Sequence, residues 1–170
     1  MMSKYKKLII STLFITLSID QLTKYLVTQN LAIYQSWPTD GIFRFTYVTN
    51  TGTAFGLLQN QTIFLTIGSF IAIFLLYYLY KNFIFQNKLL SIAIGLQLGG
   101  AIGNLIDRLR LGFVIDFINI GWWPVFNVAD SSIVIGITII STYIILEPRK
   151  NTQTKKQTET PKSQTPGNEE

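Results

Sequence analysis

The sequence predicts an all-α polytopic membrane protein with four transmembrane helices, and three observations lead to this fold class. Of its 170 residues, 48% are hydrophobic and only 14% are charged. The apolar residues form long uncharged blocks, which is typical of membrane proteins and unlike soluble domains. Four of these blocks are long enough to cross a hydrocarbon core about 30 Å thick. We therefore expect one membrane domain, residues 1–150, followed by a short tail.

The first expected span covers residues 8–27 and begins after three closely spaced lysines. This start resembles a signal peptide, but no A-x-A cleavage site follows, so we expect an uncleaved helix. The span contains Asp20 and Lys24, which lie four residues apart on one helical face. We expect the two to pair, with the lysine side chain reaching outward toward water.

The other three expected spans cover residues 62–80, 89–107 and 126–146. The second and third carry no charge before the end of the third. At 1.5 Å per residue, each of them reaches about 27 to 28 Å, close to the thickness of the hydrocarbon core. The fourth span carries Asp130 near its start, so this segment is long enough to cross the membrane only if a charged residue is counted within it.

Small and aromatic residues suggest how the spans pack and where they end. Gly99 and Gly103 form a G-x-x-x-G pattern, which predicts close packing of the third span against another helix. A cluster of aromatic residues precedes or begins the fourth span, and we expect it at the membrane interface, where aromatic rings gather; it comprises Phe117, Trp122, Trp123 and Phe126.

The loop between the first two spans is expected to form a small β element on the outer face of the membrane. Phe43, Phe45 and Tyr47 alternate with polar residues, as in a half-buried strand, and the turn-like segment 50–52 follows. Asp40 lies in a Pro-Thr-Asp-Gly stretch and is expected to be a turn residue.

Lysine and arginine residues predict the orientation of the chain. Most of them flank the start of the first span, the connection between the second and third spans, and the end of the fourth. By the positive-inside rule both termini are then cytoplasmic. Residues 151–170 contain no aliphatic or aromatic residue, so we expect this segment to be a disordered cytoplasmic tail.

The carboxylates give the strongest indication of function. With these spans, Asp20, Asp107 and Asp130 come from three different helices and all lie near the outer leaflet, while Asp116 lies in the short connection between the third and fourth spans. An ionised side chain at membrane depth costs a few kcal/mol or more, so such residues usually serve a function. Their convergence predicts a site, with Asp116 and Asp130 as its leading candidates.

Several chemistries compete for these residues. The chain has no cysteine and no histidine, which excludes thiolate nucleophiles, disulfides and histidine-based sites, and we expect no metal and no cofactor. Asp130 alone could serve as the N-cap of the fourth helix. A Ser-Lys hydrolase would need Lys24 beside a serine. A small ion-coupled transporter or channel is an alternative of a different class, but its carboxylates would be distributed across the bilayer.

At this point the residues resemble a known family. Five blocks, in this order, are similar to those of the lipoprotein signal peptidases (type II signal peptidases): Asp20-Gln-Leu-Thr-Lys24, Asn50-Thr-Gly52-Thr-Ala54-Phe-Gly56, Gly103-Asn104-Leu-Ile-Asp107-Arg108, Gly112-Phe-Val-Ile-Asp116-Phe117 and Phe126-Asn127-Val-Ala129-Asp130. The similarity extends from the first span to the fourth. Trp123 departs from the pattern, because the family often has phenylalanine there.

The resemblance implies an aspartic endopeptidase of the bacterial cytoplasmic membrane with its active site near the outer leaflet. Its substrate would be a diacylglyceryl-modified prolipoprotein, cut just before the lipid-modified cysteine, and it would act as a monomer, in contact with membrane lipid and not with nucleic acid. Asp116 and Asp130 would be the catalytic pair. The supporting and substrate-binding residues would be Asp20, Lys24, Asn50, Gly52, Asn104, Asp107, Arg108, Asn127 and Ala129.

Two neighbouring carboxylates suit this chemistry. They cannot both ionise easily, so one keeps its proton while the other can activate a water molecule. The sequence leaves open which aspartate is protonated first, because coupled titrations belong to the pair.

Overall fold

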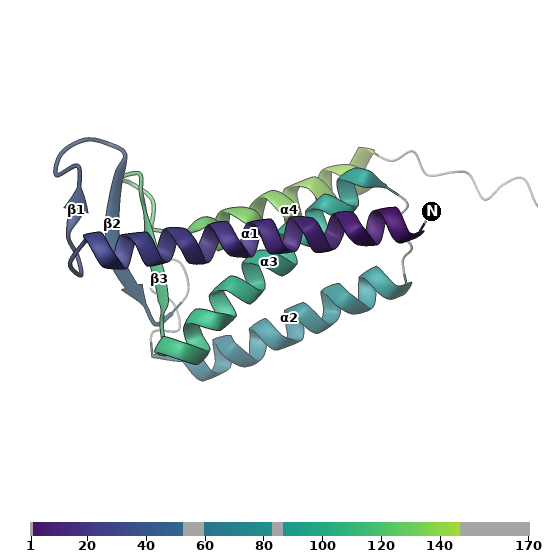
Figure 1. Ribbon diagram of the computed structural model, residues 1–170, viewed down its shortest axis with the longest axis horizontal. Helices are drawn as coiled ribbons and strands as arrows, with labels where there is room; N and C mark the ends of the chain where they lie inside the picture. Colours follow the sequence, from purple (N-terminus) through teal and green to yellow (C-terminus); the bar gives the residue numbers. More distant parts are fainter. Residues whose placement is uncertain (1, 53–59, 83–86, 147–170) are drawn as a thin grey trace, which may run out of the picture.

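The computed structural model describes residues 2–52, 60–82 and 87–146, which form four helices and a small sheet (Figure 1). The helices are α1 (Met2–Asn30), α2 (Thr62–Asn82), α3 (Lys88–Leu111) and α4 (Val128–Leu146). The strands are β1 (Ser36–Trp37), β2 (Arg44–Asn50) and β3 (Val114–Asn119). The tail 151–170 and residues 53–59, which include part of the second sequence block, lie outside the described residues.

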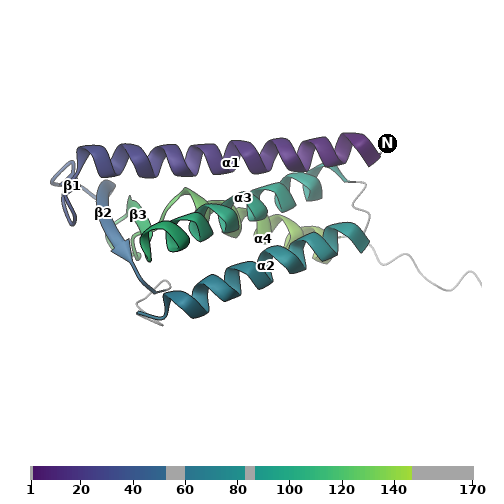
Figure 2. The same ribbon diagram turned by 60° about the horizontal axis from the view of Figure 1, so that its bottom comes forward.

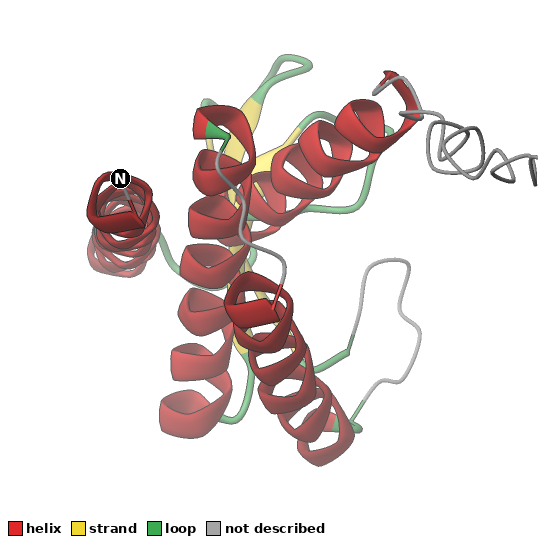
Figure 3. Ribbon diagram, turned by 90° about the vertical axis from the view of Figure 1, so that its right-hand side faces the viewer, coloured by secondary structure: helices red, strands yellow, loops and turns green. Residues whose placement is uncertain are grey.

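Helix α3 is the centre of the bundle and contacts the other three helices. Viewed along the bundle, α1, α2 and α4 surround it (Figure 3). Its glycines explain the close packing, since a Cβ on Gly99 would lie 2.8 Å from the Thr16 side chain of α1 and a Cβ on Gly103 would lie 2.5 Å from Asp20 Oδ2 of α1. The prediction of close packing at Gly99 and Gly103 is therefore confirmed.

Within the part of the chain that the structure describes, three helices are long and apolar enough to cross a membrane: Thr62–Lys81, Lys88–Leu111 and Val128–Leu146. None of the residues in the apolar stretch of α2 is buried within the protein, whereas most of those in α3 are. Helix α2 therefore presents its apolar side chains outward, beneath the rest of the bundle in Figure 2. Helix α1 is not among the three, and its span remains a prediction.

The observed helix ends differ from the predicted ones for local reasons. Helix α3 continues to Leu111, so Asp107 lies within the helix and not at its end; Gly112, at φ 79°, stops it by donating its N–H to Arg108 O at 3.1 Å. Helix α4 begins at Val128, two residues later than expected, because Phe126 pairs with Ile118 in an isolated β-bridge.

The predicted β element exists and is larger than expected. The three strands form one antiparallel sheet in the order β1-β2-β3, at one end of the bundle (Figure 1). Strand β3 comes from the segment between α3 and α4, which the sequence analysis treated as a plain connection. It aligns Asp116 with Val48 of β2. The N-terminus and the end of α4 lie at the opposite end of the bundle (Figure 1).

One aromatic residue of the predicted interface cluster is buried within the protein. Phe117 is buried, at 3% exposed, because it lies on β3 with its ring 6.4 Å from that of Phe45. Trp122, in contrast, is 79% exposed at the tip of the loop that follows β3. Asp40 lies exposed in a bend, as expected of a turn residue.

Candidate active site

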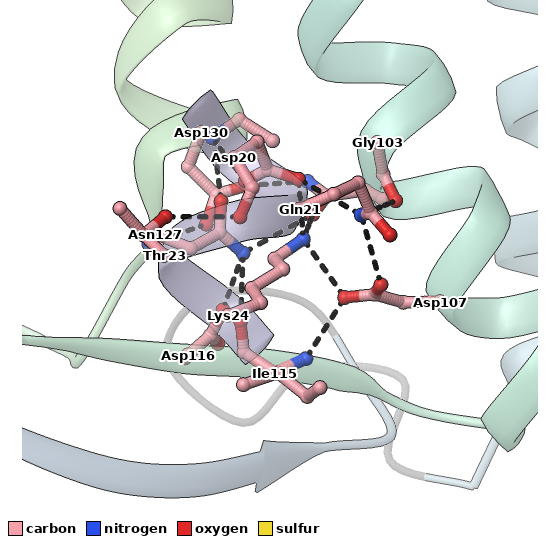
Figure 4. A network of polar contacts seen from close by, with 12 residues as sticks. Asp20, Gln21, Thr23, Lys24, Gly103, Asp107, Ile115, Asp116, Asn127 and Asp130 are labelled. Atoms are coloured by element: carbon pink, nitrogen blue, oxygen red, sulfur yellow. Dashed lines mark hydrogen bonds and ion pairs between the residues drawn. The ribbon is translucent and has the colours of Figure 1, made fainter. Parts of the chain in front are cut away.

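The two leading aspartates occupy different kinds of structure at the sheet end of the bundle. Asp116 lies on β3, and Asp130 lies in the first turn of α4. Asp116 is only 2% exposed. Both carboxyl groups enter one polar network, shown in Figure 4, and we call this pair the dyad. The sheet and the helix end therefore hold the dyad from two sides.

Both carboxyl oxygens of Asp116 accept hydrogen bonds from amide side chains. Asn127 Nδ2 donates to Asp116 Oδ1 at 2.7 Å, and Asn50 Nδ2 donates to Asp116 Oδ2 at 2.8 Å. Asn50 is itself held by a turn, because its Oδ1 accepts the Gly52 N–H at 2.9 Å. These contacts give Asn50 and Gly52 a structural part in the site.

Asp130 is held by the cap of its own helix. Asn127 is the N-cap residue of α4: its Oδ1 accepts the Asp130 N–H at 2.8 Å, and Asp130 Oδ2 accepts the Asn127 N–H at 3.3 Å. This reciprocal pattern is a capping box. The alternative in which Asp130 is the N-cap is therefore wrong, although its carboxyl group does contribute to the cap. Asp130 Oδ1 accepts a further bond, from Asn104 Nδ2 at 2.8 Å.

Asn127 connects the two carboxyl groups of the dyad. It is fully buried and contacts Asp116 through its side chain and Asp130 through both its side chain and its backbone. The same Nδ2 also lies 3.1 Å from Asn104 Oδ1 and 3.3 Å from Ile115 O. One amide thus positions both members of the dyad relative to each other.

A buried ionic group lies beside the dyad, and we call Asp20, Lys24 and Asp107 the lysine cluster. Lys24 Nζ lies 3.0 Å from Asp20 Oδ2 and 2.8 Å from Asp107 Oδ2. Lys24 is 2% exposed, so the expectation that it reaches outward to water was wrong. The expected pairing with Asp20 is confirmed. The contacts of Lys24 are carboxylates and an amide, which does not fit a Ser-Lys hydrolase.

The lysine cluster ties α1 to the helices and strand that carry the dyad. Asp20 Oδ1 accepts the Ala129 N–H at 2.9 Å, two residues after the N-cap of α4. Asp107 Oδ2 accepts the Ile115 N–H at 3.2 Å, immediately before Asp116. The cluster therefore anchors the backbone beside each catalytic candidate. A side chain at Gly103 would obstruct it, because a Cβ there would lie 2.5 Å from Asp20 Oδ2.

Arg108 points away from its neighbour Asp107, as expected for adjacent residues of a helix. Its Nη1 donates to Ser69 Oγ of α2 at 3.2 Å. Arg108 is partly exposed, whereas Lys24 is buried. Of these two cations, Arg108 is therefore the one that a ligand can reach.

The surroundings of Asp116 change its acidity. Burial raises the pKa of Asp116 to about 7, and the nearby charge of Asp130 adds to the rise. The amide bonds from Asn50 and Asn127 and the charge of Lys24 act in the opposite direction. One carboxyl group of the dyad can thus carry a proton near neutral pH.

The structure joins the predicted site residues in one network of hydrogen bonds and ion pairs, except Arg108, whose hydrogen bond goes to Ser69, and it adds contacts that were not predicted. Gln21 Nε2 lies 3.2 Å from Asp20 Oδ2, 3.3 Å from Gly103 O and 3.2 Å from Asp107 Oδ1, so it joins α1 to α3 (Figure 4). Gln21 was part of the first sequence block, and its position next to Asp20 was the available signal. Ser69, the partner of Arg108, had no such signal.

Comparison with known proteins identifies the family. Residues 12–146 match the family model described as signal peptidase (SPase) II. The lipoprotein signal peptidase of Moorella thermoacetica is 45% identical over 134 residues, covering 78% of this chain and 89% of the relative. That of Caldanaerobacter subterraneus subsp. tengcongensis is 46% identical over 132 residues, covering 76% and 90%.

Two solved structures, both described as a bacterial membrane enzyme studied by the in meso method, share the fold. The one at 2.3 Å resolution has a TM-score of 0.76 and 32% identity, over 89% of this chain and 93% of the other. The one at 1.9 Å resolution has a TM-score of 0.75 and 32% identity, over 82% and 94%. With these matches and its apolar helices, the chain belongs to the signal peptidase II family of membrane proteases.

Proposed function

We propose that this protein is an aspartic endopeptidase that removes the signal peptide from diacylglyceryl-modified prolipoproteins and cuts just before the lipid-modified cysteine. The observation that carries the proposal is the dyad: two carboxyl groups from β3 and α4, each accepting two hydrogen bonds, and both in contact with Asn127. The family names point in the same direction, since the relatives are lipoprotein signal peptidases.

In the proposed reaction the ionised member of the dyad takes a proton from a water molecule as that water attacks the scissile carbonyl. The protonated member stabilises the developing oxyanion and then gives its proton to the leaving amine. The raised pKa of Asp116 supports this division, because it leaves one carboxyl group protonated near neutral pH. One carboxyl group gains a proton from water and the other gives a proton to the amine, so the dyad carries one proton both before and after each turnover.

The supporting residues take two roles in the proposal. Asn50, Asn104 and Asn127 hold the dyad oxygens, so the carboxyl groups need not reorganise during the reaction. Arg108, which is partly exposed, binds the substrate backbone, and Gly52 supports the site by holding Asn50. The lysine cluster and Ala129 hold α1 against this arrangement.

The membrane arrangement is also part of the proposal. Helix α1 is the fourth span, because the charges of Asp20 and Lys24 are buried against α3 and need not face lipid. The sheet and the dyad then lie near the outer leaflet of the bacterial cytoplasmic membrane. Both termini are cytoplasmic, which agrees with the N-terminus and the end of α4 lying at the same end of the bundle (Figure 1). The enzyme acts as a monomer in this membrane.

The direct experiment uses the purified protein and two forms of one prolipoprotein, with and without the diacylglyceryl group. We expect a shortened product, cut before the cysteine, from the modified form alone. Equal cleavage of both forms would contradict the proposed substrate class. Absence of cleavage of the modified form by folded protein would contradict the proposed function itself.

A further inference from the structure

Lys24 makes three contacts, which match the three N–H donors of its ammonium group. Two go to carboxylates of the lysine cluster, and the third goes to Asn104 Oδ1 at 3.0 Å. The third contact is not needed to neutralise the lysine charge. It links the lysine cluster to Asn104, which in turn donates to Asp130 of the dyad.

The direction of the Asn104 amide matters because its two ends are chemically opposite. The oxygen end only accepts hydrogen bonds and the nitrogen end only donates them, yet the two ends have nearly the same shape. Lys24 has donors alone, so it requires the oxygen end toward itself. The nitrogen end then faces Asp130 Oδ1, at 2.8 Å. A reversed amide would place an acceptor against the Asp130 carboxylate and donors against the ammonium group.

We infer that Lys24 is a positioning residue of the dyad: its ammonium group fixes the orientation of the Asn104 amide, and that amide supplies the donor that Asp130 needs. The inference rests on the proposed function and assigns a role in it to a residue that touches neither Asp116 nor Asp130. Asn127 Nδ2 also donates to Asn104 Oδ1, at 3.1 Å, but it shares its hydrogens with Asp116 and Ile115 O. Lys24 is therefore the stronger constraint on this amide.

The charges around the dyad decide what the loss of Lys24 would do. On α1 these are Asp20 and Lys24, on α3 Asp107 and Arg108, on β3 Asp116 and on α4 Asp130. Replacing Lys24 removes a cation that favours the ionised form of Asp116. It also frees the Asn104 side chain to rotate, so that its Nδ2 no longer donates to Asp130. Both effects raise the pH at which the dyad loses its proton.

The test uses the purified full-length protein in detergent and follows the infrared C=O stretch of the protonated dyad carboxyl, identified as the band that Asp116→Asn removes. In Lys24→Met we expect the pH at which this band disappears to rise by about one unit. With the lipid-modified precursor, kcat should fall by about 10- to 100-fold while KM changes by less than about twofold. The infrared readout needs no substrate, so it tests the inference even if the wild-type protein does not cleave the precursor.

Two further variants keep the result interpretable. Lys24→Met leaves Asp20 and Asp107 without their cation. A second variant, Lys24→Met with Asp107→Asn, restores the net charge of the lysine cluster, and it replaces the first variant if that one does not fold.

Gln21→Leu is the matched structural control, because Gln21 bonds the same cluster and Gly103 O but neither Asn104 nor the dyad. Its infrared midpoint should equal that of the wild type.

A double-mutant cycle with Asn104→Leu identifies the route of the effect. If Lys24 acts through Asn104 as well as by its charge, adding Lys24→Met to Asn104→Leu should raise the infrared midpoint by less than Lys24→Met does alone, because only the charge effect remains. An equal change in both backgrounds would overturn the inference, because Lys24 would then act by charge alone. An unchanged midpoint in folded Lys24→Met, or in its charge-balanced form, would overturn it as well.

Discussion

Asn127 and Asp130 hold each other through two reciprocal hydrogen bonds, from the Asp130 N–H to Asn127 Oδ1 at 2.8 Å and from the Asn127 N–H to Asp130 Oδ2 at 3.3 Å. The same asparagine donates to Asp116 Oδ1 at 2.7 Å. A helix cap thus positions a catalytic candidate on α4 and contacts its partner on β3. Local helix chemistry and the proposed reaction depend on the same residue.

Replacement of Asn127 by alanine should therefore damage both stability and turnover. Losing the cap should lower the free energy of unfolding by about 1 kcal/mol. Losing the donor to Asp116 should lower kcat for the lipid-modified precursor by about 10- to 100-fold. Asn119→Ala is the matched control, because Asn119 lies on the same strand as Asp116 but bonds Thr46 and the Gly121 N–H. Equal losses of kcat in both variants would argue against a specific role for Asn127.

Gly103 should not tolerate even a methyl group. A Cβ at this position would lie 2.5 Å from Asp20 Oδ2 in the buried contact between α1 and α3. We expect Gly103→Ala to destabilise the protein by about 1 to 3 kcal/mol in thermal or denaturant unfolding. A Cβ at Gly68 of α2 would meet nothing within 4 Å, so Gly68→Ala should be neutral or stabilising by up to about 1 kcal/mol. A stable, active Gly103→Ala protein would contradict the observed packing.

The pKa of Asp116 predicts how stability depends on pH. This pKa is about 7 in the folded protein, against an ordinary value of 3.8. Because the folded chain keeps a proton that the unfolded chain loses, the contribution of Asp116 to stability is fully present below about pH 4 and is lost as the pH rises through about 7. The full contribution is about 4 kcal/mol at most.

Asp116→Asn removes this titration. Its melting temperature, measured in detergent between pH 4 and pH 8, should therefore fall less with rising pH than that of the wild type. Asp40→Asn, on an exposed bend, provides the comparison and should follow the wild type. If Asp116→Asn and the wild type lose stability in parallel over this range, Asp116 does not hold a proton at neutral pH.

The sequence was sufficient to single out Asp116 and Asp130, because an aspartate in an apolar segment is conspicuous. It also predicted the Asp20 and Lys24 pair from their spacing of four residues, the close packing at Gly99 and Gly103, and a β element before α2. These features depend on local periodicity or on the cost of charge in an apolar environment. Each of them can be recognised within a few residues of the chain.

Features that depend on distant parts of the chain were not predicted. Asp116 was assigned to a connection, because β3 becomes a strand only by pairing with β2, more than sixty residues earlier. Lys24 was expected to reach water, because nothing near it in the sequence reveals Asp107 and Asn104 as its partners. The contact of Arg108 with Ser69 was missed for the same reason. Such partners are selected by tertiary packing and not by local pattern.

The central claim is that Asp116 and Asp130 together perform the hydrolysis, and single-turnover cleavage of a diacylglyceryl-modified precursor by Asp116→Asn and Asp130→Asn tests it most directly. Both variants should be recovered folded from the membrane, bind the precursor, and cleave it more slowly than the wild type by about 10⁴-fold or more. Cleavage by either folded variant at a rate within about tenfold of the wild type would contradict the claim.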